Sequence, residues 1–255
     1  MSTLTVTPAP AAEVPRGLVN PLYVQLDIRR VLRNRRTLVF TLVMPVVFYF
    51  SFGASQPGAD AKAYVMLSFA VYGAMVAATS VGASVAVERA SGWSRQLRLT
   101  PMRPATYVAS KVIAAASIAV IPVAVELVIG AATGARMRAS AWVVGGLVAW
   151  IGSLVFAALG LAIGYLVPSE NAMQVMGPVL ALLALLGGLF VPLSIFGHTL
   201  QTVASFTPAY GVGVLAHWQL SHDGSFVGAI ANLVVWTAVF GAGAALLFRR
   251  DTGRV

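Results

Sequence analysis

The sequence contains no cysteine. A disulfide framework, a thiol nucleophile and a cysteine-ligated metal site are therefore excluded, and the compartment has to be inferred from topology. Charged residues are also scarce, at 10% of 255 positions, whereas hydrophobic residues make up 58% and the mean hydropathy is +0.84. This composition lies outside the range of soluble domains and is typical of a polytopic membrane protein.

Sequence motifs for nucleotide binding and hydrolysis are missing as well. The P-loop pattern G-x-x-x-x-G-K-[ST] does not occur, and neither do the hydrolase patterns H-E-x-x-H and G-x-S-x-G. The three histidines, His198, His217 and His222, lack the spacing that would place two metal ligands on one helix face, and we interpret them as interfacial polar residues. We expect no catalytic residue, metal site or cofactor in this chain.

The sequence consists largely of long apolar runs. Crossing a hydrocarbon layer of roughly 30 Å takes about 20 helical residues. We therefore predict an all-α membrane protein with six transmembrane helices in a single domain, residues 21–255. The first twenty residues lack the pattern of a cleaved signal peptide and are predicted to form a disordered cytoplasmic tail. The six runs cover residues 37–54, 63–87, 111–133, 141–167, 174–196 and 226–248.

The distribution of cations predicts the orientation of these runs. All but three of the 17 lysines and arginines lie before the first run, between the second and third, or after the last. The exceptions, Lys62, Arg136 and Arg138, lie in the alternate loops. The positive-inside rule then places both termini in the cytoplasm. Because the cations flank apolar runs, anionic lipid headgroups explain the net charge of +9 better than nucleic acid does.

Residues ahead of the first run predict an amphipathic helix along the inner leaflet, with Pro21 suited to its first position. Leu22 and Leu26 lie off its apolar face. A basic flank that merely orients the first span is the alternative interpretation. The two predicted faces carry Val24, Ile28, Val31 and Leu32 on one side and Arg29, Arg33 and Arg36 on the other.

A polar, basic segment, residues 88–111, separates the second and third runs. Gly92 is expected to end the preceding helix, and Pro101 and Pro104 to delimit a short cytoplasmic helix, after which Thr106 would cap the third span. The arginines of this segment could simply lie on anionic headgroups, each contributing about 1 kcal/mol. Alternatively, a firmly bounded helix with an aromatic residue could bind a partner. The residues alone leave both interpretations open.

Two stretches resemble the type 2 ATP-binding-cassette (ABC) exporter permeases, the membrane subunits of bacterial drug, polysaccharide and lipid exporters. Residues 187–215, GGLFVPLSIFGHTLQTVASFTPAYGVGVL, are similar to the end of the family's fifth span and its external re-entrant helical hairpin. Gly197 and His198 stand where the family often has proline. The segment between the second and third runs matches the family in E-R-x-S-G at 88–92, then Leu97, Leu99, Thr100, Pro101, Tyr107 and Lys111.

The resemblance implies that the short cytoplasmic helix is a coupling helix, which docks in a groove of a separate P-loop ATPase subunit. Two such subunits would bind ATP and Mg and drive alternating access in a permease dimer, expected to be a homodimer, in the bacterial inner membrane. Trp93 is the expected anchor, because aromatic residues often dominate binding energy. The residues expected at this contact are Glu88, Arg89, Gly92, Trp93, Arg95, Leu97, Arg98 and Pro101.

The expected cargo is an amphiphilic drug-like or antibiotic compound moved out of the cell. Export of a lipid or lipid-linked glycan is the main alternative. A non-transporting sensor or immunity subunit, and a membrane-embedded enzyme, are alternatives from other classes. An enzyme would turn over its substrate without ATP, whereas a sensor would bind a partner without moving anything.

Candidate wall residues of a substrate path lie on the second and fifth runs. Ser68, Tyr72, Met75 and Thr79 share one helical face. Helix packing through small and hydroxyl residues explains this stripe first. In the resembled family, however, these two spans flank the path between permease subunits, so the stripe could line it. The adaptable side chains expected on the fifth run are Met173, Met176 and Leu180.

Glu126 is the acidic residue inside a predicted span. Pro122, four residues earlier, leaves a backbone carbonyl without its helical partner, and a protonated Glu126 could hydrogen bond in that turn. This structural role is our first interpretation of Glu126. Handling of substrate or protons is the alternative, because ionisable groups within membranes are often functional.

Overall fold

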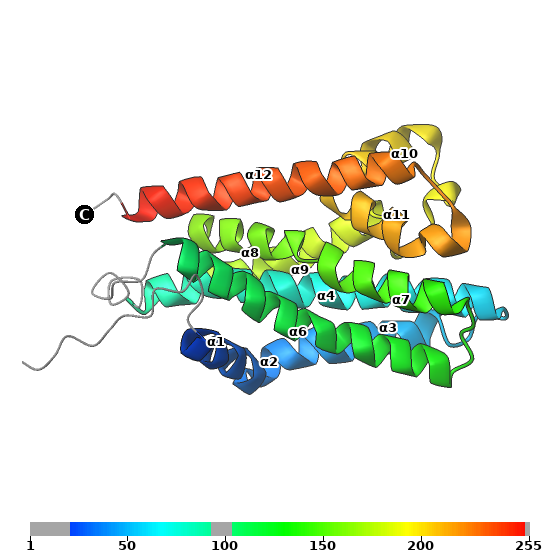
Figure 1. Ribbon diagram of the computed structural model, residues 1–255, viewed down its shortest axis with the longest axis horizontal. Helices are drawn as coiled ribbons and strands as arrows, with labels where there is room; N and C mark the ends of the chain where they lie inside the picture. Colours follow the sequence, from blue (N-terminus) through cyan, green and yellow to red (C-terminus); the bar gives the residue numbers. More distant parts are fainter. Residues whose placement is uncertain (1–20, 93–103, 253–255) are drawn as a thin grey trace, which may run out of the picture.

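The computed structural model describes residues 21–92 and 104–252, and these residues form helices without any strand. Long helices run side by side along the long axis of the molecule (Figure 1). The end of α4, the start of α6 and the C-terminal end of α12 meet at one end of this bundle, whereas α10 and α11 lie at the other (Figure 1). The predicted all-α architecture is confirmed for these residues.

The N-terminal half contains α1 (Pro21–Arg33), α2 (Arg35–Leu38), a π-helix (Val39–Val43), α3 (Met44–Phe52), α4 (Ala59–Ala90) and α6 (Pro104–Ala132). The C-terminal half contains α7 (Ala139–Leu147), a second π-helix (Val148–Gly152), α8 (Val155–Leu166), α9 (Ser169–Leu186), a 3₁₀ turn (Leu193–Ile195), α10 (His198–Ser205), α11 (Pro208–Ser221) and α12 (Phe226–Thr252).

Four helical stretches among the described residues are long and apolar enough to cross a membrane. They match the second, third, fourth and sixth predicted spans and cover Ala59–Ala90, Thr106–Ala132, Ala139–Leu166 and Phe226–Phe248. Two shorter apolar helices, Thr41–Phe52 and Gln174–Leu186, stand at the first and fifth predicted spans. The chain is thus a multi-pass membrane protein. Helical structure continues over residues 35–52 at the first predicted span, whereas the fifth predicted span ends ten residues early, at Leu186.

Proline and glycine explain where the helices depart from regular geometry or end earlier than predicted. The first apolar segment contains the π-helix Val39–Val43 just before Pro45, because proline supplies no N–H to continue the regular ladder. The fifth run does not remain helical to residue 196: α9 ends at Leu186, and Gly188 has φ +76°. Thr106 does not cap α6 either, because the helix already begins at Pro104.

The central helix of the bundle is α4, which packs against α6, α8, α3, α9 and α11. Its contact with α8 is made backbone to backbone by small residues. A Cβ added at Gly160 would lie 2.2 Å from the carbonyl oxygen of Thr79, and one at Gly82 would lie 2.3 Å from that of Ala157. Such close approach is how helices associate in lipid, where apolar side chains gain little by leaving their surroundings.

The predicted apolar face of the amphipathic helix α1 packs mainly on the bundle, although Leu32 of that face is 40% exposed. Val24 and Val31 of the predicted apolar face are buried, and α1 packs against α6. Leu22 and Leu26, which lie off that face, are 62% and 55% exposed. The helix therefore directs its main apolar face into the bundle and leaves a second group of leucines on its outer side.

Candidate functional site

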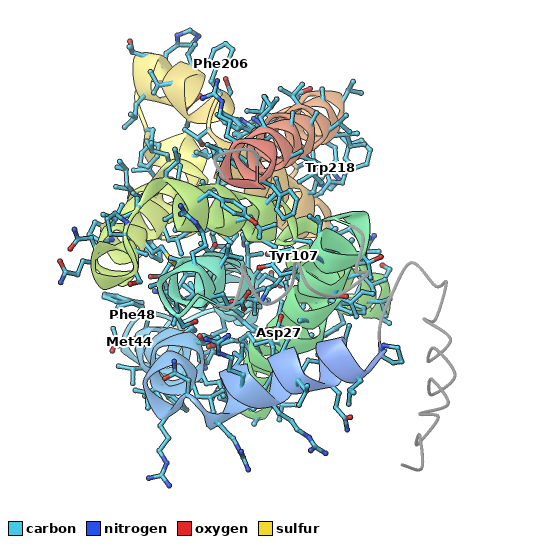
Figure 2. The ribbon with its side chains drawn as sticks, turned by 90° about the vertical axis from the view of Figure 1, so that its left-hand side faces the viewer. Asp27, Met44, Phe48, Tyr107, Phe206 and Trp218 are labelled. Atoms are coloured by element: carbon cyan, nitrogen blue, oxygen red, sulfur yellow. The ribbon has the colours of Figure 1, made fainter. Side chains whose placement is uncertain are left out.

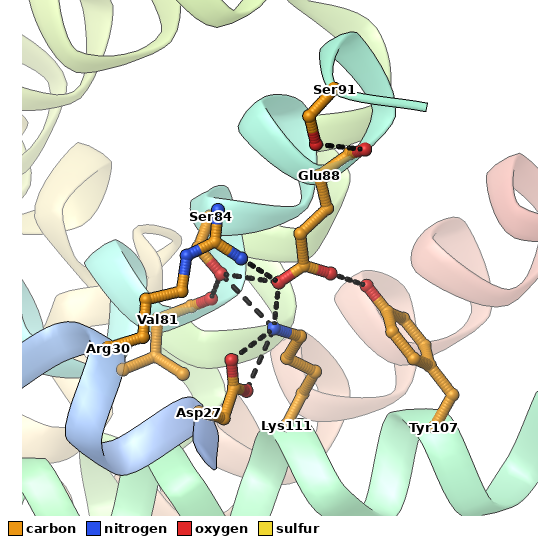
Figure 3. Close-up of polar contacts among 8 residues, drawn as sticks. All are labelled: Asp27, Arg30, Val81, Ser84, Glu88, Ser91, Tyr107 and Lys111. Carbon is orange, nitrogen blue, oxygen red and sulfur yellow. Dashed lines mark hydrogen bonds and ion pairs between the residues drawn. The ribbon is translucent and has the colours of Figure 1, made fainter. Parts of the chain in front are cut away.

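A buried cluster of charged residues lies at the end of the bundle where α4 leads into segment 93–103. Lys111 on α6 is its centre: Nζ lies 2.5 Å from Oε1 of Glu88 on α4 and 2.9 Å from Oδ1 of Asp27 on α1 (Figure 3). All three side chains are at most 4% exposed. Figure 2 shows Asp27 pointing from α1 into the bundle. One ammonium group thus joins three helices.

Both carboxylate oxygens of Glu88 accept further hydrogen bonds. The Tyr107 hydroxyl donates to Oε2 at 2.7 Å, and Nη1 of Arg30 donates to Oε1 at 3.2 Å (Figure 3). Arg30 is about half exposed, at 47%, so it connects the cluster to the surface. Two carboxylates and two cations balance in charge, which a buried ionic cluster needs to be tolerated.

Asp27, the acid that α1 contributes, has a shifted pKa. Burial raises this pKa above its usual value, because desolvation disfavours the carboxylate, and the negative charge of Glu88 raises it further. The positive charges of Lys111 and Arg30 act in the other direction and lower the pKa of Asp27. The ionised form of Asp27 therefore depends on Lys111, which couples the position of α1 to that of α6.

Arg89 connects the end of α4 to a fourth helix. Its Nη1 donates to the carbonyl oxygens of Gly164 and Tyr165 on α8, at 3.2 and 2.8 Å, and its guanidinium lies 5.6 Å from the centroid of the Tyr165 ring. These acceptors are the last turn of α8, where carbonyls lack helical partners and attract a cation. Glu88 and Arg89 together tie α4 to α1, α6 and α8.

The predicted ATPase contact is only partly among the described residues. Glu88 is buried and faces the cluster rather than solvent. Gly92 follows α4 with φ +73°, as expected for the residue that ends the helix. The other predicted contact residues, Trp93, Arg95, Leu97, Arg98 and Pro101, lie outside the described residues.

The predicted polar stripe on α4 lies mostly in the helix core. Ser68, Met75 and Thr79 are completely buried, and only Tyr72 of the four is partly exposed. In the middle of α4 the partly exposed residues are Tyr72, Val76, Ser80 and Ser84. Apart from Tyr72, this face lies one position further along the helix than the predicted stripe.

The fifth-span candidates on α9 face inward as well. Met176 and Leu180 are 3% and 2% exposed, and Met176 packs against Ala83 and Ile163. Met173 lies on α9, and its side chain is outside the described part of the structure. The outward face of α9 carries Val175, Pro178 and Leu182 instead.

Glu126 is fully buried on α6, and neither carboxyl oxygen has a hydrogen-bond partner among the described residues. The hydrogen bond expected in the turn of Pro122 is therefore not formed in this arrangement. Around Glu126, α6 packs tightly on α4. A Cβ added at Gly130 of α6 would lie 2.1 Å from Sδ of Met66, and a Cβ added at Gly73 of α4 would lie 2.8 Å from Cβ of Pro122.

Sequence reasoning missed two functional candidates. Asp27 was not distinguished from the rest of α1, although an acid on the apolar side of a basic helix is a signal for a buried partner. His217 is 4% exposed, and its Nε2 lies 3.1 Å from Oγ of Ser68 on α4, a partner that the sequence did not predict. No group of three or more potential metal ligands occurs in residues 21–92 and 104–252.

Helices of bilayer length, a glycine-mediated core and an ionic cluster at one end define a multi-pass helical membrane protein. The chain matches the family model described as ABC-2 family transporter protein over residues 54–246. It is 30% identical over 206 residues to "Putative transport permease YvfS" of Bacillus subtilis (strain 168), covering 78% of this chain and 84% of the relative. The chain belongs to the ABC-2 family of transporter proteins.

Membership makes the chain a transport permease, the membrane subunit of a transporter, and implies a separate ATPase subunit as its partner. The resemblance inferred from residues 88–111 and 187–215 is thereby confirmed at the level of the family.

Proposed function

We propose that this chain is the permease of an ATP-driven exporter that moves an amphiphilic, drug-like compound out of the cell by alternating access. Two copies of the chain would pair with two copies of the ATPase, which binds ATP and Mg. Residues 93–103 would form the coupling helix. The observation that carries the proposal is the way both ends of this segment are tied to the bundle by Glu88, Arg89 and Lys111.

The ties matter because a docked helix transmits force only if its ends cannot slip. Glu88 and Lys111 stand on α4 and α6, the two helices that flank segment 93–103, and they are joined at 2.5 Å. Asp27 extends the connection to α1 and Arg89 extends it to α8. Movement of the segment would displace four helices together, as rigid-body alternating access requires.

The proposed topology has six spans and cytoplasmic termini. The two shorter apolar helices, Thr41–Phe52 and Gln174–Leu186, would complete the six with help from their flanking residues, because a short span is accommodated by local thinning of the bilayer. Helices α10 and α11 would then form the external hairpin. The distribution of lysine and arginine supports this orientation.

The partly exposed faces of α4 and α9 are the proposed walls of the substrate path. Tyr72, Val76 and Ser80 on α4 present an aromatic ring and a hydroxyl among apolar atoms, and α9 presents Val175 and Leu182. Such a surface suits a molecule that is mainly apolar with a few polar groups. The buried residues Ser68, Met75 and Thr79 would support this wall from behind.

Docking is tested by purifying the permease together with a cognate P-loop ATPase. We expect the double substitution Trp93→Ala and Arg95→Ala to abolish recovery of the ATPase, because the anchor and a neighbouring charge would both be lost. The matched control is Arg136→Ala with Arg138→Ala, which removes two residues at the opposite end of the bundle and should leave recovery unchanged. Equal recovery with both variants would exclude this docking site.

The cargo is tested on the same complex in proteoliposomes. Amphiphilic cations, neutral amphiphiles and phospholipids are compared for stimulation of ATP hydrolysis. Stimulation by lipids alone would identify the alternative, a lipid exporter, and ATP-independent turnover of a compound would contradict transport altogether.

A further inference from the structure

The outer face of α1 presents apolar and basic side chains together. Leu22 and Leu26 are 62% and 55% exposed, and Arg29 and Arg33 are exposed as well. These four residues stand at i, i+4, i+7 and i+11, so they follow one another along a single side of the helix. The buried side chains of α1, Asp27 among them, lie on the opposite side. The outer face therefore has an apolar first half and a cationic second half.

The direction of α1 turns this face toward the membrane. Figure 2 looks along the long helices, and α1 runs across that view with nitrogen-tipped side chains extending away from the bundle. Figure 1 places α1 beside α4 and α6 rather than beyond their ends. Lys111, which binds Asp27, lies about 10 Å along α6 from its start at Pro104. Because α4 and α6 can cross a membrane, α1 lies roughly in the membrane plane.

Charge makes an anionic group the expected ligand of this face. Residues 21–38 contain five arginines and one acid, Asp27, which is buried and bound to Lys111. Among the residues that the structure describes, none forms an ion pair with Arg29 or Arg33. A guanidinium group binds a phosphate through two parallel hydrogen bonds. Since Arg29 and Arg33 are about one turn apart, one phosphodiester can contact both.

The exposed leucines favour a phospholipid over a soluble anion or a protein. Leu22 and Leu26 continue the face that carries the arginines, so a lipid whose phosphate lies on the arginines can place its acyl chains on the leucines. Helices that lie in a membrane plane bind through this combination of apolar area and basic charge. An ATPase would approach segment 93–103 at the end of the bundle, whereas the outer face of α1 is on its flank.

We propose that the outer face of α1 binds an anionic phospholipid, with the phosphate on Arg29 and Arg33 and the acyl chains on Leu22 and Leu26. The assignment to the inner leaflet and the role in transport rest on the proposed function. The ionic cluster connects α1 to α4 and α6. The bound lipid therefore holds α1 on the bundle and steadies both ends of segment 93–103.

Lipid binding is measured on the purified full chain in an uncharged detergent at low ionic strength. Gln25→Cys, the only thiol of that variant, carries an environment-sensitive fluorophore at an exposed position beside the outer face. Phosphatidylglycerol, phosphatidylcholine and inorganic phosphate are titrated separately. We expect phosphatidylglycerol to bind roughly thirtyfold more tightly than phosphatidylcholine, which is about fivefold for each of two arginines. Inorganic phosphate at the same concentration should not displace the lipid.

The selectivity for the anionic lipid is then assigned to residues. Arg29→Gln with Arg33→Gln should reduce the ratio of the two lipid affinities from roughly thirty to about one, because both phosphate ligands are neutralised. The matched control is Arg136→Gln with Arg138→Gln, which neutralises two exposed arginines at the other end of the bundle and should leave the ratio unchanged.

The leucines are tested by Leu22→Ser with Leu26→Ser. This variant should bind both lipids more weakly and keep the ratio of their affinities, because acyl contacts do not depend on the headgroup. A preserved ratio also shows that the site is still folded.

The role in transport is measured on the complex with the ATPase in nanodiscs. Adding phosphatidylglycerol to phosphatidylcholine should raise ATP hydrolysis roughly fivefold, the low end of typical coupling between two sites. Arg29→Gln with Arg33→Gln should abolish this stimulation. Binding of phosphatidylglycerol without any effect on hydrolysis would remove the role of the lipid in coupling.

Other outcomes would overturn the site itself. Equal affinity for the two lipids, or selectivity that survives Arg29→Gln with Arg33→Gln, would contradict it. Displacement by inorganic phosphate would identify a site for a soluble anion. Loss of ATPase recovery from this variant in detergent without phospholipid would assign the outer face to the partner protein. The lipid titrations use the permease alone, so their failure is distinguishable from failure of docking at 93–103.

Discussion

At the scale of single residues, most of the charged groups inside this protein can be accounted for by a partner on another helix. Lys111 is the clearest case, because it is 1% exposed and lies between Glu88 and Asp27. Lys111 stood out in the sequence only as part of a family motif, and Asp27 did not stand out at all. A buried charge signals the need for a partner, but which helix supplies the partner depends on how the helices are rotated.

Lys111 and Arg30 allow a matched comparison, since both are cations bound to the same carboxylate oxygen of Glu88. Lys111→Met leaves two buried acids and should lower the free energy of unfolding by about 3 to 5 kcal/mol. Arg30→Met removes a half-exposed cation and should cost about 1 kcal/mol or less. Thermal unfolding in detergent, followed by tryptophan fluorescence, measures both.

Adding Asp27→Asn to Lys111→Met should recover part of the loss, because one of the two uncompensated acids is removed. Equal destabilisation by Lys111→Met and Arg30→Met would mean that burial of the cluster does not determine its strength.

At the scale of elements, glycine decides how closely helices approach. Gly160 and Gly164 are one turn apart on α8, and both face the α4 backbone. The spacing is visible in the sequence as G-x-x-x-G, yet other glycines of the chain, such as Gly241 on α12, have no atom within 4 Å of an added Cβ. Only the contact shows which glycines are required.

We predict opposite effects for the same substitution at these two positions. Gly160→Ala places a Cβ 2.2 Å from the Thr79 carbonyl oxygen, so α8 must move away from α4, at a cost of about 1 to 3 kcal/mol. Gly241→Ala should be neutral or stabilise by about 0.5 to 1 kcal/mol, because alanine favours a helix. Midpoints of thermal unfolding in one detergent compare them directly. A stable Gly160→Ala variant would contradict the close α4–α8 packing.

At the scale of the whole molecule, charge distribution and motif order predict the orientation. Ser91 follows α4 beside the ionic cluster, whereas Gly58 precedes α4 at its other end. In the cysteine-free chain, Gly58→Cys should react with an impermeant maleimide in intact cells. Ser91→Cys should react only after permeabilisation. The reverse pattern would place the termini outside and remove segment 93–103 from any cytoplasmic ATPase.

Hydrophobic length, the asymmetry of lysine and arginine and two family motifs are local properties of the chain, and they were sufficient to predict the class of this protein. They do not reveal which face of each span is buried. In a uniformly apolar helix such as α4, hydrophobicity does not distinguish a neighbouring helix from lipid, so Ser68, Met75 and Thr79 could be assigned to either. Close backbone contacts and the pairing of Asp27, Glu88 and Lys111 decided that rotation, and both exist only once the helices have packed.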